Sequence, residues 1–154
     1  MGPVWRVCCL PGRTPTDRFV RPVRPGGGYV GGLWHARRMP CDIPDARELV
    51  GQLDAVSVTE LDRYTKFEVE GRTFGYLWEP TATVGLKQTI AEQTALVAER
   101  PEVFEVQFTA YGFGWVVVHL DGVERDELAE LVFEAWRLSA PASLLQTRGE
   151  RLPV

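Results

Sequence analysis

Residues 66–75 read KFEVEGRTFG, and the fold follows from this stretch. Lys66, Glu68 and Glu70 alternate with apolar residues, which is the two-residue period of a strand with one wet face and one buried face. Gly71 favours a turn into the apolar run that follows. The stretch therefore predicts an antiparallel hairpin whose second strand places three aromatic residues on one face: Phe74, Tyr76 and Trp78.

The chain beyond this hairpin shows further strands. After a break at Glu79-Pro80, apolar residues alternate over residues 82–87, and they alternate again over residues 103–108. Residues 111–114 read as a turn. The run WVVVHL at residues 115–120 is apolar on both faces, which predicts a central strand covered on both sides.

Three helices are predicted around these strands. Asp42 can cap a helix that has Pro44 in its first turn and ends near Leu53. Residues 89–92, TIAE, form a capping box that starts a second helix, and a third covers about residues 124–139. Residues 56–60 fit either a helix or a strand. Strands joined by short turns, with helices before, between and after them, predict an α+β fold: a two-layer sandwich with an antiparallel sheet and helices packed on one face.

The composition divides the chain into three parts. Residues 42–141 carry the predicted elements and form one domain, and residues 142–154 are expected to be a flexible tail. Residues 1–40 hold six prolines, seven glycines and seven arginines against one acidic residue, and their apolar residues follow no period. We therefore expect residues 1–40 to be a disordered, basic leader rich in glycine and proline.

This leader has two interpretations. A flexible arginine-rich arm can bind nucleic-acid phosphates, because it gains free energy from counterion release without a fold of its own. The favoured interpretation is that the biological start lies at Met39, directly before the first helix, so that residues 1–38 are upstream sequence. A mitochondrial transit peptide is disfavoured, since proline and glycine at this density prevent the amphipathic helix that such peptides form.

Charge and hydropathy restrict the function. Residues 41–154 carry 10 Lys and Arg against 20 Asp and Glu, which gives a net charge of −10. The sequence has no run of 18 apolar residues and no signal-peptide segment, so we expect a cytoplasmic protein with no membrane partner. Cys8, Cys9 and Cys41 fit neither a disulfide framework nor a metal-site spacing, and all three are expected outside the domain.

Four stretches resemble the MmcQ/YjbR family. Residues 66–75 resemble its F-x-V-x-G-K-x-F-A hairpin, and residues 84–87, VGLK, resemble its V-x-L-K strand. Residues 114–120, GWVVVHL, resemble its GWV-x-V-x-L strand, and residues 126–138 resemble its closing helix. The resemblance covers about 100 residues. It implies the CyaY-like fold of that family, a helical layer on an antiparallel sheet, and it implies DNA binding.

DNA contacts would have to come from a small patch beside the hairpin and the turn before the central strand. The basic and aromatic candidates there are Arg63, Lys66, Arg72, Lys87, Tyr111 and Trp115. Acidic residues are interleaved with them: Glu60, Asp62, Glu68 and Glu70. A solvated, salt-bridged sheet face is the favoured interpretation, because the net charge of the domain opposes a polyanion.

Other candidate sites have simpler explanations. The aromatic stripe on the second hairpin strand could be a ligand platform, but alternating aromatic residues that face a helical layer are expected to be core. His119 stands alone on a valine-rich strand, which favours a structural or sheet-surface role over that of a general base. No catalytic, cofactor-binding or metal-binding set is recognised, so we expect neither an enzyme nor a cofactor.

Acidic residues on two predicted helices offer a further alternative. Frataxin relatives with the CyaY-like fold hold iron weakly on an acidic helical ridge, and the similar residues here are Asp42, Asp45, Glu48, Glu124, Asp126, Glu127 and Glu130. The helix dipole explains acidic first turns more simply. The expected function is a small non-enzymatic binding or regulatory module of the MmcQ/YjbR type. The alternatives are a protein-interaction module, with a homodimer formed through the sheet face, and a weak metal binder.

Overall fold

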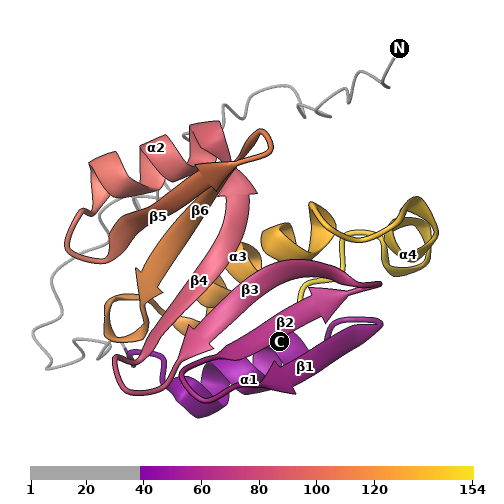
Figure 1. The fold of residues 1–154 in the computed structure, drawn as a ribbon, viewed down its shortest axis with the longest axis horizontal. Coiled ribbons are helices and arrows are strands. Elements are labelled where there is room, and N and C mark those ends of the chain that lie inside the picture. The colour runs from indigo at the N-terminus through magenta and orange to yellow at the C-terminus, as the bar shows by residue number, and fades with distance from the viewer. Residues whose placement is uncertain (1–38) are drawn as a thin grey trace, which may run out of the picture. The chain divides into compact units, whose positions relative to one another are not determined.

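The structure is a computed structural model that describes residues 39–154. The predictions made for residues 1–38 lie outside this range. Within it, one antiparallel sheet has six strands in the order β1-β2-β3-β4-β6-β5 (Figure 1). The strands are β1 (Val56–Glu60), β2 (Thr65–Val69), β3 (Arg72–Trp78), β4 (Thr83–Thr89), β5 (Phe104–Ala110) and β6 (Phe113–His119).

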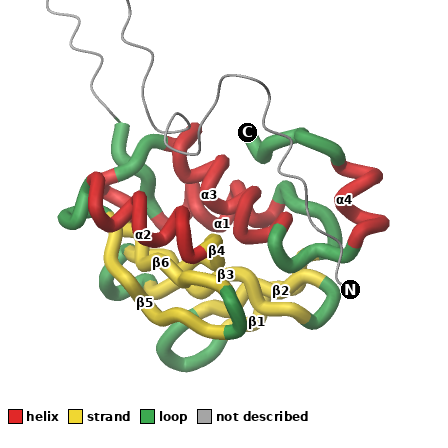
Figure 2. Tube along the Cα trace, turned by 90° about the horizontal axis from the view of Figure 1, so that it is seen from above, coloured by secondary structure: helices red, strands yellow, loops and turns green. Residues whose placement is uncertain are grey.

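The helices of the described residues are α1 (Ile43–Gly51), α2 (Ile90–Glu99), α3 (Arg125–Arg137) and α4 (Ala142–Arg148). Viewed from above, α1, α2 and α3 lie on the same side of the sheet (Figure 2). The predicted α+β architecture, an antiparallel sheet with helices packed against one face, is confirmed. Residues 56–60, which the sequence left unassigned, form the edge strand β1.

Local signals fix where the first two helices begin. The Asp42 carboxylate accepts a hydrogen bond from the Asp45 backbone N–H at 2.9 Å, and the Asp45 carboxylate accepts one from the Asp42 backbone N–H at 3.1 Å. The Thr89 hydroxyl accepts from the Glu92 N–H at 3.1 Å. These bonds satisfy backbone donors that a helix start leaves free, so both predicted N-caps are confirmed.

The core lies between the sheet and the helical layer. Its largest fully buried side chains are Trp136 of α3 and three phenylalanines of the sheet, Phe67, Phe74 and Phe104. Each such side chain contributes about 1.5–3 kcal/mol when fully buried. The indole N–H of Trp136 donates to the backbone oxygen of Asp54 at 3.0 Å, so this large ring is anchored to the chain that follows α1.

The prediction for the aromatic stripe of β3 is wrong in part. The ladder pairs Phe67 with Gly75 but Glu68 with Thr73, so Phe74 is an extra residue, a β-bulge, on β3. The bulge shifts the alternation by one position, and Phe74 turns to the core. Tyr76 and Trp78 therefore lie on the opposite face, half-buried instead of in the core.

Cys41 belongs to the folded domain, contrary to the prediction. It is buried, and its backbone N–H donates to the oxygen of Val123 at 3.1 Å. Burial, with a contribution from the Asp45 carboxylate, raises the pKa of the Cys41 thiol to about 11. The side chain is therefore a neutral thiol at physiological pH, and it packs as a small apolar group.

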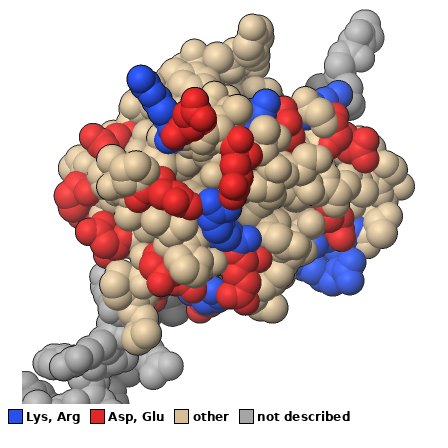
Figure 3. Space-filling view, turned by 60° about the horizontal axis from the view of Figure 1, so that its bottom comes forward, with Lys and Arg blue, Asp and Glu red and all other residues tan. Residues whose placement is uncertain are grey.

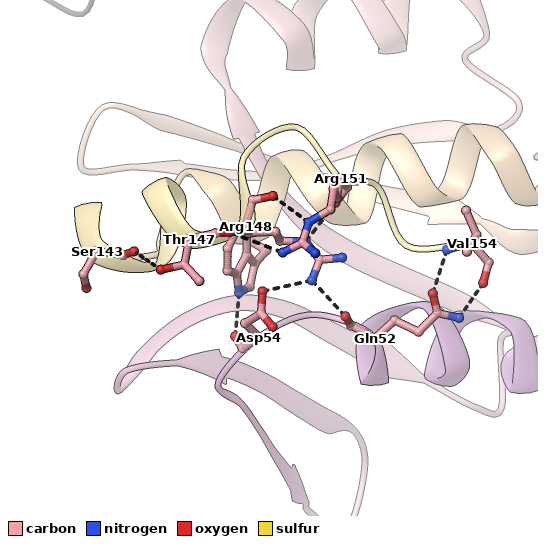
Figure 4. Close-up of polar contacts among 8 residues, drawn as sticks. Gln52, Asp54, Ser143, Thr147, Arg148, Arg151 and Val154 are labelled. Atoms are coloured by element: carbon pink, nitrogen blue, oxygen red, sulfur yellow. Dashed lines mark hydrogen bonds and ion pairs between the residues drawn. The ribbon is translucent and has the colours of Figure 1, made fainter.

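The predicted flexible tail at residues 142–154 is also wrong. It forms α4 and a segment that packs against the loop after α1 (Figure 4). Arg148 is 8% exposed and donates to the oxygen of Gln52 at 2.9 Å and to the Asp54 carboxylate at 3.0 Å. The Val154 N–H donates to the Gln52 side chain at 2.6 Å. The prediction failed because an arginine in a polar segment gives no sign of a partner about a hundred positions away.

Candidate binding face of the sheet

One face of the sheet is not covered by any helix of residues 39–154, and it turns toward the viewer in Figure 1. We call it the helix-free face. Aromatic rings cross it in a row that comprises Tyr64, Tyr76, Trp78, Trp115 and Phe108. Tyr76 lies at the centre, with ring centroids 5.5 Å from Tyr64, 5.9 Å from Trp78 and 5.5 Å from Trp115. These contacts give one continuous apolar strip, which we call the aromatic row.

The row ends at the edge strand β5. Trp115 is 7% exposed because it lies between Tyr76 and Phe108, whose ring centroid is 5.1 Å away. Phe108 is 38% exposed. A β-bulge on β5 places it there, since the ladder pairs Val106 with Val116 and Phe108 with Trp115, which leaves Gln107 as the extra residue. The exposed end of the row therefore depends on an irregularity of the strand.

Gly85 of β4 makes room at the centre of this face. A Cβ at this position would lie 2.9 Å from the ring of Trp78 and would collide with the side-chain oxygen of Gln107. Because Gly85 has no side chain, the Trp78 ring and the Gln107 side chain both pack directly against its backbone. The Gln107 side-chain oxygen is buried and has no hydrogen-bond partner among the described residues, which is uncommon for a buried polar atom.

An ion pair and a histidine–carboxylate contact border the row on the same face. Lys66 contacts Glu68 at 3.1 Å on β2, and the imidazole of His119 contacts Glu105 at 2.6 Å across β6 and β5. Glu70, predicted to share the strand face of Lys66, lies instead in the turn after β2 with a positive φ of 49°. Acidic and basic side chains are interspersed over the surface shown in Figure 3. The row is thus an apolar strip with a border of both charge signs.

A polar groove of about 410 Å³ adjoins the row at Tyr64. Arg47 of α1 lies in its wall and contacts Glu60 at 3.3 Å and Glu79 at 2.5 Å. The hydrogen bond to Glu79 raises the pKa of Arg47 above its usual value. Since the guanidinium joins both carboxylates, an ion-pair network lines the groove at this side.

The six candidate contact residues fall at different places. Lys66 is the cross-strand partner of Tyr76, and the ring of Trp115 contacts that of Tyr76, so Lys66 and Trp115 meet at the aromatic row. Arg63 lies in the β1–β2 loop beside the groove. Tyr111 is fully exposed at the tip of the β5–β6 turn. Lys87 is the cross-strand partner of Trp115 and lies where β3 leaves β4, and Arg72 lies at the start of β3 beyond its last pair with β4.

Sequence reasoning missed Tyr64, Phe108, Gln107 and Gly85 as members of this face. The alternation through Lys66 gives a weak signal for Tyr64, which lies two positions before it. Phe108 has no such signal, because the bulge of β5 reverses the side to which the alternation assigns it. Gln107 keeps the side of Glu105, and nothing in the sequence places its side chain at Gly85. Gly85 is recognisable only once its neighbours are known.

Three of the acidic residues proposed for a metal-binding ridge, on α1 and α3, contact arginines. Arg125 contacts Asp45 at 2.6 Å and Glu48 at 3.1 Å, and Arg100 pairs with Glu127. The hydrogen bond from the Asp42 backbone, and then Arg125, keep the pKa of Asp45 below its usual value. Within residues 39–154 no group of three or more His, Cys, Asp or Glu side chains is arranged to hold a metal ion.

No helix among residues 39–154 is long and apolar enough to cross a membrane.

Comparisons with known proteins agree with this architecture. A crystal structure of Deinococcus radiodurans protein DR2400, with a DUF419 domain, matches with a TM-score of 0.61 and 20% identity, over 73% of this chain and 91% of that one. At this identity the likeness shows the fold. No curated protein matches the sequence. The family model YjbR matches residues 52–138, which is more than half of the chain, and the chain therefore belongs to the YjbR family.

Proposed function

We propose that this chain is a non-enzymatic binding module that docks another protein on the helix-free face of its sheet. The aromatic row carries this proposal, since Tyr, Trp and Phe are enriched at the centres of protein interfaces. A second copy of the chain is the first candidate partner. An isologous interface must complement itself, and the border of the row carries both signs of charge in Lys66, Glu68 and Glu105.

Two observations support a role other than catalysis. The Cys41 thiol is buried, and its raised pKa disfavours the thiolate that a nucleophile requires. His119 is engaged by Glu105 on a sheet surface, and neither a serine nor a cysteine hydrogen-bonds to its ring among the described residues. Cys41 and His119, the one cysteine and the one histidine of residues 39–154, are therefore not arranged as a nucleophile and its base.

Self-association tests this proposal, with Phe108→Ser as the variant and Tyr111→Ser as its matched control. Phe108 ends the row, whereas Tyr111 is an exposed aromatic residue outside it. We expect sedimentation equilibrium to show a dimer for the wild type and for Tyr111→Ser. Phe108→Ser should weaken the dimer by about tenfold, as expected for loss of an interface aromatic worth more than 1 kcal/mol. A wild-type chain that stays monomeric at about 100 μM, a concentration at which weak dimers form, contradicts a homodimer.

DNA binding is the second candidate, and the family resemblance is its support. The net charge of −10 for residues 41–154 opposes a polyanion, and Lys66 is already neutralised by Glu68. We therefore expect residues 39–154 alone to bind a duplex of 20 base pairs weakly or not at all near 0.15 M salt. Fluorescence anisotropy measures this. A dissociation constant near 1 μM or tighter in that salt would establish DNA binding by the domain itself.

A further inference from the structure

The sheet splits where β3 separates from β4. The β3–β4 ladder runs from the pair Trp78 and Thr83 to the pair Gly75 and Leu86, and β4 continues to Thr89 without this neighbour. Figure 1 shows β3 bending away from β4 at this point. Lys87 is the first residue of β4 beyond the last pair. Its side chain therefore lies at an opening in the sheet.

The Lys87 ammonium is held in place by two neighbours. It donates to the Ser139 hydroxyl, just after α3, at 3.2 Å and lies 4.0 Å from the centre of the Phe113 ring. Ser139 is buried and Lys87 is half-buried. An ammonium has three N–H donors, and no further acceptor contacts this one among the described residues. At least one donor is therefore available to a ligand.

Arg72 lies on the part of β3 that has no pair on β4, so it flanks the same opening and brings a second positive charge to it. Burial, and then the charge of Arg72, lower the pKa of Lys87. Neither residue forms an ion pair with a carboxylate among the described residues, although residues 41–154 hold twice as many acidic as basic side chains. Six other basic residues of this part do form such pairs: Arg47, Lys66, Arg100, Arg125, Arg137 and Arg148.

Lys87 is half-buried and lies near the exposed Arg72, and neither has a counter-ion among the described residues, so an anion from outside would offset the desolvation of the ammonium and the repulsion between the two charges. We propose that Arg72 and Lys87 form a binding site for a phosphate group, with Ser139 as the residue that positions the ammonium. A phosphate carries close to two negative charges at neutral pH and offers several acceptor oxygens, which suits a guanidinium and an ammonium together. Lys87 is the cross-strand partner of Trp115, so the site adjoins the aromatic row, but the proposal does not depend on docking at that row.

Titration of the full chain tests the site, with inorganic phosphate and phenyl phosphate as the two probes. The readout is the shift of the Lys87 and Ser139 backbone amides in ¹H–¹⁵N NMR spectra, at constant ionic strength set with chloride. This local readout separates the site from phosphate held by the arginines of residues 1–40. We expect saturable shifts with a dissociation constant of about 1 mM or tighter. Tighter binding of phenyl phosphate would assign the ligand to phosphate monoesters, and equal binding would assign it to free phosphate.

Variants make the assignment specific. Arg72→Gln and Lys87→Gln should each weaken binding by about tenfold, because each removes one charge-assisted contact. Arg72 is exposed, so its variant keeps the fold even where Lys87→Gln does not. Lys66→Gln, a lysine on β2 that is paired with Glu68, is the matched control and should bind like the wild type. The proposal is overturned if the wild type shows no saturable shifts, or if Lys66→Gln weakens phosphate binding as much as Arg72→Gln does.

Discussion

Gly114→Ala is expected to lower the free energy of unfolding by about 3 kcal/mol, the upper part of the range for an overpacked core. A Cβ at this position of β6 would lie 2.7 Å from Cβ and Cδ of Gln93. Gln93 cannot move freely, because its side-chain amide donates to the backbone oxygens of Phe108 at 3.1 Å and Trp115 at 2.9 Å. The added methyl group must therefore displace α2 or break the bonds that tie this helix to β5 and β6.

Thermal unfolding followed by circular dichroism measures this effect. A loss of 3 kcal/mol corresponds to a fall in Tm of roughly 10 °C for a domain of this size. Gly51→Ala is the control, since the same change at the end of α1 meets no atom within 4 Å. It should leave Tm unchanged or raise it slightly, because alanine favours a helix more than glycine does. Equal Tm values for Gly114→Ala and the wild type would show that α2 is not held as described.

Arg148→Ala is expected to lower the free energy of unfolding by about 2 kcal/mol. The guanidinium joins the backbone oxygens of Gln52 and Arg151 and the Asp54 carboxylate, and it lies beside the rings of Phe133 and Trp136. Its removal leaves part-buried acceptors without their donors, and a fully buried one would cost about 1–3 kcal/mol. Asp54 is 46% exposed, so water compensates for part of the lost ion pair.

Arg151→Ala is the matched control on the same segment. Arg151 also donates to backbone oxygens, those of Arg148 and Thr147, but its side chain is exposed. Chemical denaturation should place the midpoint of Arg151→Ala close to that of the wild type and the midpoint of Arg148→Ala clearly below both. Similar midpoints for the two variants would mean that residues 142–154 add little to the stability of the domain.

The sequence predicted what local physics determines. The hairpin around Gly71 and the caps at Asp42 and Thr89 depend on residues a few positions apart, and all three were placed correctly. The contact between Arg148 and Gln52 depends on residues 96 positions apart and has no local signal. The helix-free face shows the same division. Lys66 and Trp115 stood out by their chemistry, whereas their meeting at Tyr76 follows only from the register of four strands.

The two bulges also have a consequence for the comparison of family members by sequence alignment. Phe74 and Gln107 are each one residue in excess of the regular ladder. The number of residues between the ladder pairs that flank each bulge therefore decides on which face of the sheet Tyr76 and Phe108 lie. A homologue that lacks either extra residue would align without an obvious mismatch, yet its aromatic side chains would point into the opposite layer. Gaps placed at these two positions, more than the identity of the aromatic residues, would then separate relatives that retain the aromatic row from those that have lost it.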